Sequence, residues 1–178
     1  ELAGAVGLFF TLPQTSNLVS IGDRIFHSIF HSISAFNNAG ISLYTNSFYE
    51  AHVQNSYVTH LILAGLIFLG ALGFTTIMEL ISPKEMRDRL RLPWKKMHIS
   101  SRIAIKSSFH LIIFGTVMFL WLEWDNVTLN GLDTVEKVIT SLFQSITTRT
   151  AGFNTVDFAE LGLPILMVFI LLMFIGGS

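Results

Sequence analysis

The chain has 178 residues, of which 51% are apolar and 13% are charged, and its mean hydropathy is positive. This composition excludes an ordinary soluble domain and favours a membrane protein. The absence of Cys excludes a disulfide framework and a thiolate metal site. The net charge of -1 hides an asymmetry, because residues 84–102 carry seven basic and two acidic side chains. Such a bias predicts that this segment is cytoplasmic.

The chain alternates long apolar runs with shorter and more polar segments. A membrane span needs about 20 apolar residues. By that criterion residues 2–12 are predicted to be the tail of one span, and residues 161–175 the beginning of another. Full spans are predicted over 57–81 and 103–122. The chain lacks an initiator Met and ends inside an apolar run, so we interpret it as a piece of a longer protein.

Two segments have helical periodicity but are too short to cross a bilayer. They cover residues 23–36 and 133–148, and fourteen residues give only about 21 Å of helix. Asp23 near the start of the first suits the positive end of a helix dipole. Within the run 57–81, we expect Gly65, Gly70 and Gly73 to mark close approach to a neighbouring helix, because small residues let helix backbones touch in lipid.

An internal repeat links the two short segments. Residues 30–43, FHSISAFNNAGISL, align without a gap on residues 142–155, LFQSITTRTAGFNT, at an offset of 112 positions. Asn38-Ala39-Gly40 then fall on Thr150-Ala151-Gly152. In each copy a short helix runs into a Gly-containing turn, and a long apolar run follows, which indicates a repeated architecture. With one crossing on either side of the basic segment 84–102, both turns are expected to open to the outer face.

The two turns favour a cation. Irregular backbone at membrane depth is tolerated only beside protein or a water-filled path. The short helices would point their partly negative C-terminal ends inward, and Gly40 and Gly152 permit backbone angles that turn successive carbonyls toward one axis. Neither turn contains Asp or Glu, so selectivity is expected from carbonyl dipoles rather than from a carboxylate ring.

The motifs SAFNNAG and TTRTAGFN resemble the second and third pore loops of the Trk/Ktr/HKT superfamily of potassium transporters, and the Ktr membrane subunit is the most similar. The resemblance implies an all-α membrane protein of repeated membrane helix–pore helix–membrane helix units, like potassium channels, with four repeats in a complete polypeptide. This chain would hold the second repeat over 1–81 and the third over 103–178, joined by a basic cytoplasmic linker over 82–102.

The resemblance also implies a site. Residues at the positions of the potassium-channel TVGYG signature would bind K⁺, with Na⁺ as a further candidate ion and no organic cofactor, and only the Gly of each loop is retained from that signature. These positions are Asn38, Ala39, Gly40, Ile41, Thr150, Ala151, Gly152 and Phe153. The end of the chain resembles the start of the family's intramembrane gating loop, which would make Gly176, Gly177 and Ser178 part of a cytoplasmic-side gate.

The function that the resemblance implies is potassium uptake through a channel-like pore in the cell membrane. The implied partners are a second copy of the membrane subunit, forming a homodimer, and a cytoplasmic ring of nucleotide-binding subunits that would set the gate with ATP or ADP. The protein would be a multi-pass membrane protein in contact with lipid. We expect neither enzymatic activity nor a nucleic-acid partner.

Several polar residues beside the turns have two interpretations. A cation at Arg149 in the pore would repel potassium, so we expect it to turn away from the axis and to brace the loop through an acidic residue, of which Asp157 is the nearest in sequence. Asn37 and Asn38 could bind ions directly, but a supporting amide role is favoured, because carbonyl selectivity needs a held backbone. His27 and His31 have the i, i+4 spacing of a metal pair, but no third ligand is evident, which favours hydrogen bonding or packing.

Two other classes of function stay open on the sequence. A secondary transporter with broken helices would also contain re-entrant segments. An intramembrane serine protease could pair Ser42 with His60, although the second copy carries Asn154 where Ser42 stands in the first, and an enzyme has no need of two matched loops.

Overall fold

The computed structural model describes residues 1–13, 20–50, 53–82, 87 and 97–176. Over these residues the chain is all-α, as predicted, and contains no strand. The helices are α1 (Leu2–Thr11), α2 (Ile21–Phe36), α3 (Tyr57–Ala71), α4 (Phe74–Ile81), α6 (Ile99–Glu123), α7 (Thr134–Thr150) and α8 (Leu163–Ile175), with short 3₁₀ helices at Ser47–Tyr49 and Phe158–Glu160.

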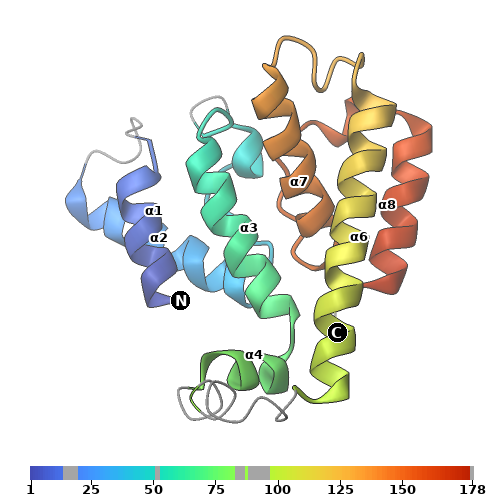
Figure 1. The fold of residues 1–178 in the computed structure, drawn as a ribbon. Helices are drawn as coiled ribbons and strands as arrows, with labels where there is room; N and C mark the ends of the chain where they lie inside the picture. The colour runs from blue at the N-terminus through green and yellow to red at the C-terminus, as the bar shows by residue number, and fades with distance from the viewer. Residues whose placement is uncertain (14–19, 51–52, 83–86, 88–96, 177–178) are drawn as a thin grey trace.

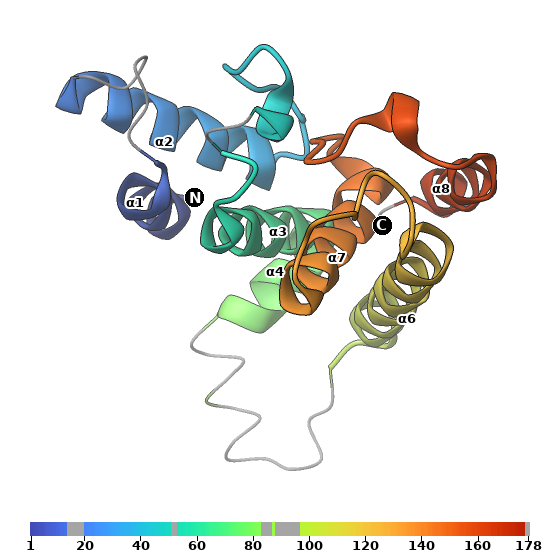
Figure 2. The same cartoon turned by 90° about the horizontal axis from the view of Figure 1, so that it is seen from above.

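The helices form two groups of three. α1, α2 and α3 all contact one another, and so do α6, α7 and α8. The groups are joined where α3 packs against α7, which lies at the centre of the molecule seen from above (Figure 1, Figure 2). The two copies of the internal repeat therefore fold into the same kind of three-helix unit, and the short helix, α2 or α7, is the second of the three in chain order.

The short helices keep the limited length that the sequence predicts. α2 has 16 residues and α7 has 17, which correspond to about 24 and 26 Å, less than the roughly 30 Å of a bilayer core. Both begin at defined caps. The Ser20 side chain accepts a hydrogen bond from the Gly22 N–H, and Asp133 with Glu136 forms a reciprocal capping box at the start of α7.

The predicted long spans have different outcomes. The apolar run at 103–122 forms one continuous helix, the 25-residue α6. The prediction of one continuous span over 57–81 is wrong, because the run breaks into α3 and α4, which are bent by 111°. Gly73 starts α4 with a φ of 75°, an angle that costs little only for Gly. Among the described helices, α6 alone passes a length and hydropathy test for a span, or α6 and the bent pair if that pair is counted as one.

Within this run, Gly70 marks a close approach between helices. A Cβ atom on Gly70 would overlap the Phe36 carbonyl at the end of α2, so α3 and α2 touch backbone to backbone there. The same prediction for Gly65 is wrong, since nothing lies within 4 Å of the space a Cβ would take. Gly70 thereby presses α3 against the residues that lead into the first turn.

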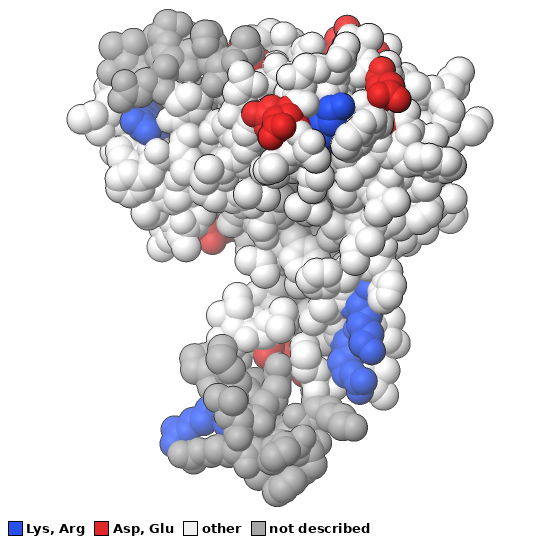
Figure 3. Space-filling view, turned by 45° about the horizontal axis from the view of Figure 1, so that its top comes forward, with Lys and Arg blue, Asp and Glu red and all other residues white. Residues whose placement is uncertain are grey.

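The outside of the molecule is largely uncharged. In Figure 3 most of the visible surface is neither acidic nor basic, and blue atoms gather at the lower end, where α6 begins with Arg102 and Lys106 in its first turns. Helix α2 shows the pattern most clearly: its exposed face carries Ile21, Ile25, Phe26, Ile29 and Ile33. Its buried face carries Ser28, His31, Ser32, Ser34 and Ala35. This is the reverse of a surface helix in a soluble protein and fits an apolar surrounding.

Candidate ion-binding site

The C-terminal ends of α2 and α7 bring the two Gly turns into contact. The Thr150 hydroxyl lies 3.1 Å from the Asn38 amide. Two residues after Asn38 and one after Thr150, the loops meet again, because a Cβ atom on Gly40 would overlap the Ala151 carbonyl. The residues that the internal repeat pairs in sequence are therefore neighbours in space.

The backbone of the two turns is similar at the Gly and different before it. Gly40 and Gly152 have φ of 68° and 83°, in the left-handed region that favours Gly. Asn38 shares that region with a φ of 53°, which Asn tolerates better than most residues. Thr150, its counterpart, is the last residue of α7, and Ala151 keeps a right-handed helical conformation. The first turn leaves the helix two positions earlier than the second.

The reason for this difference lies in the hydrogen bonds that end each helix. The Thr147 carbonyl accepts from both the Ala151 N–H (3.0 Å) and the Gly152 N–H (2.9 Å), so α7 continues up to its Gly. In the first copy the Ser34 carbonyl accepts from the Ala39 N–H (2.9 Å), and the chain turns at Asn38. Residues 150–151 thus keep a helical backbone, whereas the first copy has already left its helix at Phe36.

Asn38 is tied to three parts of the structure. With its amide nitrogen facing Thr150, the side chain donates to the Thr150 hydroxyl (3.1 Å) and to the Ile67 carbonyl (3.2 Å). Its oxygen then accepts from the Ala71 N–H (3.2 Å), and this orientation of the amide is the one that satisfies every group around it. The side chain thus braces the first turn against α3 and against the second turn, which is the supporting role expected for it.

The residues that follow the two Gly point in opposite directions. Phe153 is fully buried, whereas Ile41 is 60% exposed. The Ile41 carbonyl accepts a hydrogen bond from Ser34 Oγ (2.7 Å), so that oxygen is turned back toward α2. Ala39 and Gly152 are exposed, and Asn38, Gly40 and Thr150 are partly exposed, so the turns present accessible backbone on the side away from the core.

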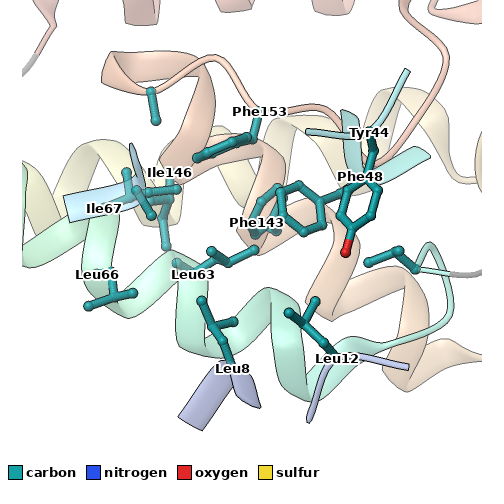
Figure 4. Close-up of a cluster of buried hydrophobic side chains, with 14 of the residues drawn as sticks. Leu8, Leu12, Tyr44, Phe48, Leu63, Leu66, Ile67, Phe143, Ile146 and Phe153 are labelled. Carbon is teal, nitrogen blue, oxygen red and sulfur yellow. The ribbon is translucent and has the colours of Figure 1, made fainter. Parts of the chain in front are cut away.

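A cluster of aromatic rings fills the space behind the turns (Figure 4). Phe48 packs edge-to-face on Phe153 with ring centroids 5.3 Å apart, and Tyr44 packs in the same way on Phe48 at 5.6 Å. Burial, with a smaller contribution from Glu50, raises the pKa of Tyr44 to about 12, so its hydroxyl stays neutral at physiological pH. Offset and edge-to-face packing of this kind makes a stiff support.

Arg149 does not take the acidic partner predicted for it, Asp157. Its guanidinium donates to the Gly176 carbonyl (2.8 Å) and lies 3.4 Å from Ser108 Oγ. Asp157 instead caps a 3₁₀ helix by accepting from the Ala159 N–H. The α8 C-terminus offers Arg149 a partly negative carbonyl end, which accounts for the choice of partner. Gly176, with a φ of 63°, ends α8 there, while Gly177 and Ser178 lie outside the described residues.

Asn37 is further from the turn than its neighbour. Its amide donates to the Ile33 carbonyl of its own helix (2.9 Å) and lies 3.4 Å from a Glu1 carboxylate oxygen. It closes the end of α2 and makes no contact with the second turn. Asn37 and Asn38 could not be distinguished from the sequence, because only the backbone angle at Asn38 decides which amide faces α3.

The metal and protease interpretations lose their support. Among the described residues no group of three or more His, Cys, Asp or Glu could hold a metal ion. Ser42 Oγ lies 3.3 Å from His31 Nε2, whereas the His60 ring packs on Phe143 at 5.3 Å, so the structure does not form the Ser42–His60 pair that the protease alternative requires. His31 makes the hydrogen bonds and ring packing favoured for it. Ser34 is the contacting residue that sequence reasoning missed, and its i, i+3 spacing from His31 on α2 was the available signal.

A polar pocket of about 360 Å³ lies outside the turns. It is lined by Thr45, Asn46, Ser47, Tyr49, Asn154 and Asp157. Ser47 also accepts from the Asn154 N–H at 3.4 Å, so the loops that follow the two turns meet there as well. Asp157, expected to support the turn through Arg149, contributes a carboxylate to this pocket instead.

Known proteins have sequences similar to this one over most or all of its length. The family model TrkH, described as cation transport protein, matches residues 1–178. The chain is 38% identical over 182 residues to Ktr system potassium uptake protein B of Vibrio alginolyticus, which covers 99% of this chain and 37% of that protein. It is 34% identical to the protein of the same name from Bacillus subtilis (strain 168), over 86% of this chain and 33% of the relative.

A third relative carries a second ion in its name. Potassium/sodium uptake protein NtpJ of Enterococcus hirae is 32% identical over 86% of this chain and 32% of its own length. The chain therefore spans about a third of the length of each of these relatives (37%, 33% and 32%). The match of the family model over every residue shows that this chain belongs to the TrkH family of cation transport proteins, a family of membrane proteins with repeated pore helices.

Proposed function

We propose that this chain is the second and third of four repeats in a potassium uptake protein, and that its two Gly turns form half of the ion selectivity filter. The observation that carries the proposal is the meeting of the turns at the ends of two short helices, through Asn38 with Thr150 and Gly40 with Ala151. The names of the relatives from Vibrio and Bacillus, both potassium uptake proteins, support potassium as the ion.

The arrangement suits a dehydrated cation. The C-terminal ends of α2 and α7 carry the partly negative end of each helix dipole, and no acidic side chain lies in residues 37–41 or 149–153. Main-chain oxygens of residues 38–40 and 150–152 would replace water around K⁺. Because Thr150 and Ala151 have a helical backbone, fewer carbonyls would face the axis from the second turn than from the first.

In this proposal α8 ends at the gate. Gly176 closes α8 and is held by Arg149 from the end of α7, which would connect the lower edge of the filter to the gating loop at 176–178. Residues 84–102 face the cytoplasm, and the turns open outward. The complete subunit forms a homodimer and takes a ring of nucleotide-binding subunits on its cytoplasmic side.

The test is ion uptake by the complete polypeptide in a bacterial strain without potassium uptake systems of its own. Growth and ⁸⁶Rb⁺ uptake at low external potassium support the proposal. Absence of both, with the protein present in the membrane, overturns it. Because one relative is named for potassium and sodium, sodium uptake is measured in parallel, and sodium uptake without potassium uptake would replace potassium by sodium as the substrate.

A further inference from the structure

His31 is completely buried on the inward face of α2, and its hydrogen bonds define its tautomer. Its Nδ1 lies 2.8 Å from the His27 carbonyl oxygen. A carbonyl can only accept a hydrogen bond, so Nδ1 carries the hydrogen. In the neutral ring Nε2 then has a free lone pair and acts as an acceptor.

That acceptor faces the residues that follow the first Gly turn. The Leu43 N–H lies 3.3 Å from His31 Nε2, and the Ser42 hydroxyl lies at the same distance. Ser42 Oγ in turn accepts from the Tyr44 N–H at 3.1 Å. One side chain of the pore helix therefore holds two consecutive residues directly and a third through a hydroxyl.

Ser34, three residues further along α2, completes the contact. Its hydroxyl donates to the Ile41 carbonyl at 2.7 Å. Together His31 and Ser34 bind the backbone over Ile41–Leu43, which begins immediately after Gly40. The His31 ring also stacks on Tyr44, with centroids 5.0 Å apart and planes 12° apart, so the imidazole cannot rotate away from Leu43 without losing that packing.

The second copy of the repeat lacks the side chains that make these hydrogen bonds. The counterparts of His31 and Ser34, at the offset of 112, are Phe143 and Ile146, and both are buried and apolar. The second turn is anchored instead by Phe153, whose ring is fully buried. The same helix position thus requires a ring in both copies, and only the first copy uses that ring as a hydrogen-bond acceptor.

We propose that the neutral His31 imidazole is a positioning residue that fixes residues 41–43, directly after the first filter turn, and thereby contributes to discrimination between K⁺ and Na⁺. This inference rests on the proposed function. When residues 41–43 are held less firmly, the carbonyls of residues 38–40 can move toward a smaller ion. Selectivity therefore falls more than total flux. Losing one hydrogen bond of this kind lowers the K⁺/Na⁺ flux ratio by about three- to tenfold.

The experiment uses the complete polypeptide in vesicles, with K⁺ and Na⁺ fluxes measured separately and normalised to folded protein. His31→Phe copies the second repeat, since it keeps a ring on Tyr44 and removes the acceptor, and it lowers the flux ratio. His31→Gln offers an amide oxygen to the Leu43 N–H and retains most of the ratio. His27→Phe is the matched control, because the His27 side chain contacts Tyr44 only through ring packing at 5.5 Å, and its ratio stays at the wild-type value.

Each outcome supports or overturns the role inferred for His31. An unchanged ratio in His31→Phe overturns the inference and would point to ring packing alone. An equal loss in the Phe and Gln variants also overturns it, because restoring an acceptor would then restore nothing. If His31→Phe is not recovered folded, ¹⁵N NMR of the histidine-labelled wild type takes its place. A neutral Nδ1–H tautomer at pH 7 supports the inference, and a charged ring or an Nε2–H tautomer overturns it. A wild-type protein that passes no K⁺ would refute the proposed function itself.

Discussion

The carbonyl oxygen of Ala151 occupies the space where a side chain on Gly40 would begin. Gly152 is different, because nothing lies within 4 Å of its missing Cβ. Both have positive φ, which costs a residue with a Cβ about 1–2 kcal/mol. At Gly40 the overlap with backbone is added to that cost. The two Gly of the repeat are therefore unequal, although the sequence presents them as equivalent.

Gly40→Ala is accordingly expected to abolish ⁸⁶Rb⁺ uptake by the complete polypeptide, whereas Gly152→Ala retains measurable uptake with lower K⁺/Na⁺ selectivity. Uptake is normalised to the amount of protein in the membrane. Equal activity of the two variants would contradict the contact between the turns.

Asn38 and Thr150 are expected to be energetically coupled. The double variant Asn38→Ala/Thr150→Val, which removes both sides of the 3.1 Å contact, costs less than the sum of the two single variants, with a coupling of about 0.5–1.5 kcal/mol. Thr150→Val keeps the shape of the side chain and removes only the hydroxyl. The cycle is measured by thermal unfolding in detergent, and strictly additive shifts would show that the two turns act independently.

Gly70→Ala is expected to destabilise the protein, and Gly65→Ala is its control on the same helix. A methyl group at Gly70 meets the Phe36 carbonyl, and overpacking of this kind costs about 1–3 kcal/mol. At Gly65 there is space, and Ala is the better helix former by up to about 1 kcal/mol. Thermal unfolding of both variants should move the midpoint down for Gly70→Ala and leave it or raise it for Gly65→Ala; the reverse order would refute the close approach of α2 and α3.

Arg149→Gln is expected to increase basal flux in the absence of any activating nucleotide. The charged hydrogen bond to Gly176 (2.8 Å) holds the end of α8, and bonds of this class contribute about 1.5–3 kcal/mol, enough for a tenfold or greater rise in the open fraction. Ser108→Ala removes only the longer 3.4 Å contact and should have little effect. A fall in normalised flux with Arg149→Gln would argue that Arg149 supports the open filter instead.

The arrangement of short and long helices could be predicted from the sequence because it depends on local signals. Apolar run length, the Gly turns and the helix caps decide where α2, α6 and α7 begin and end. The break at Gly73 in the apolar run 57–81 was missed, since a Gly within an apolar run is also compatible with a continuous helix, and only the backbone angle of 75° distinguishes the two.

The partners of the side chains could not be predicted. Arg149 has an acidic residue near it in sequence, but the fold brings the end of α8 closer than Asp157. Likewise the hydrogen bonds of His31 depend on where residues 41–43 return, and no periodicity encodes that path. The roles of the filter residues stay predictions, because a carbonyl becomes a ligand only through its orientation to the three other loops of the proposed pore.

The most direct test is to locate the ion. Crystals of the complete polypeptide grown in Rb⁺ should give an anomalous scattering peak on the axis beside the main-chain oxygens of residues 38–40 and 150–152, and Na⁺ should weaken it only at large excess. If the same protein takes up Rb⁺ in vesicles and shows no peak there, or shows one held by side-chain carboxylates elsewhere, then these turns are not the site at which the ion loses its water.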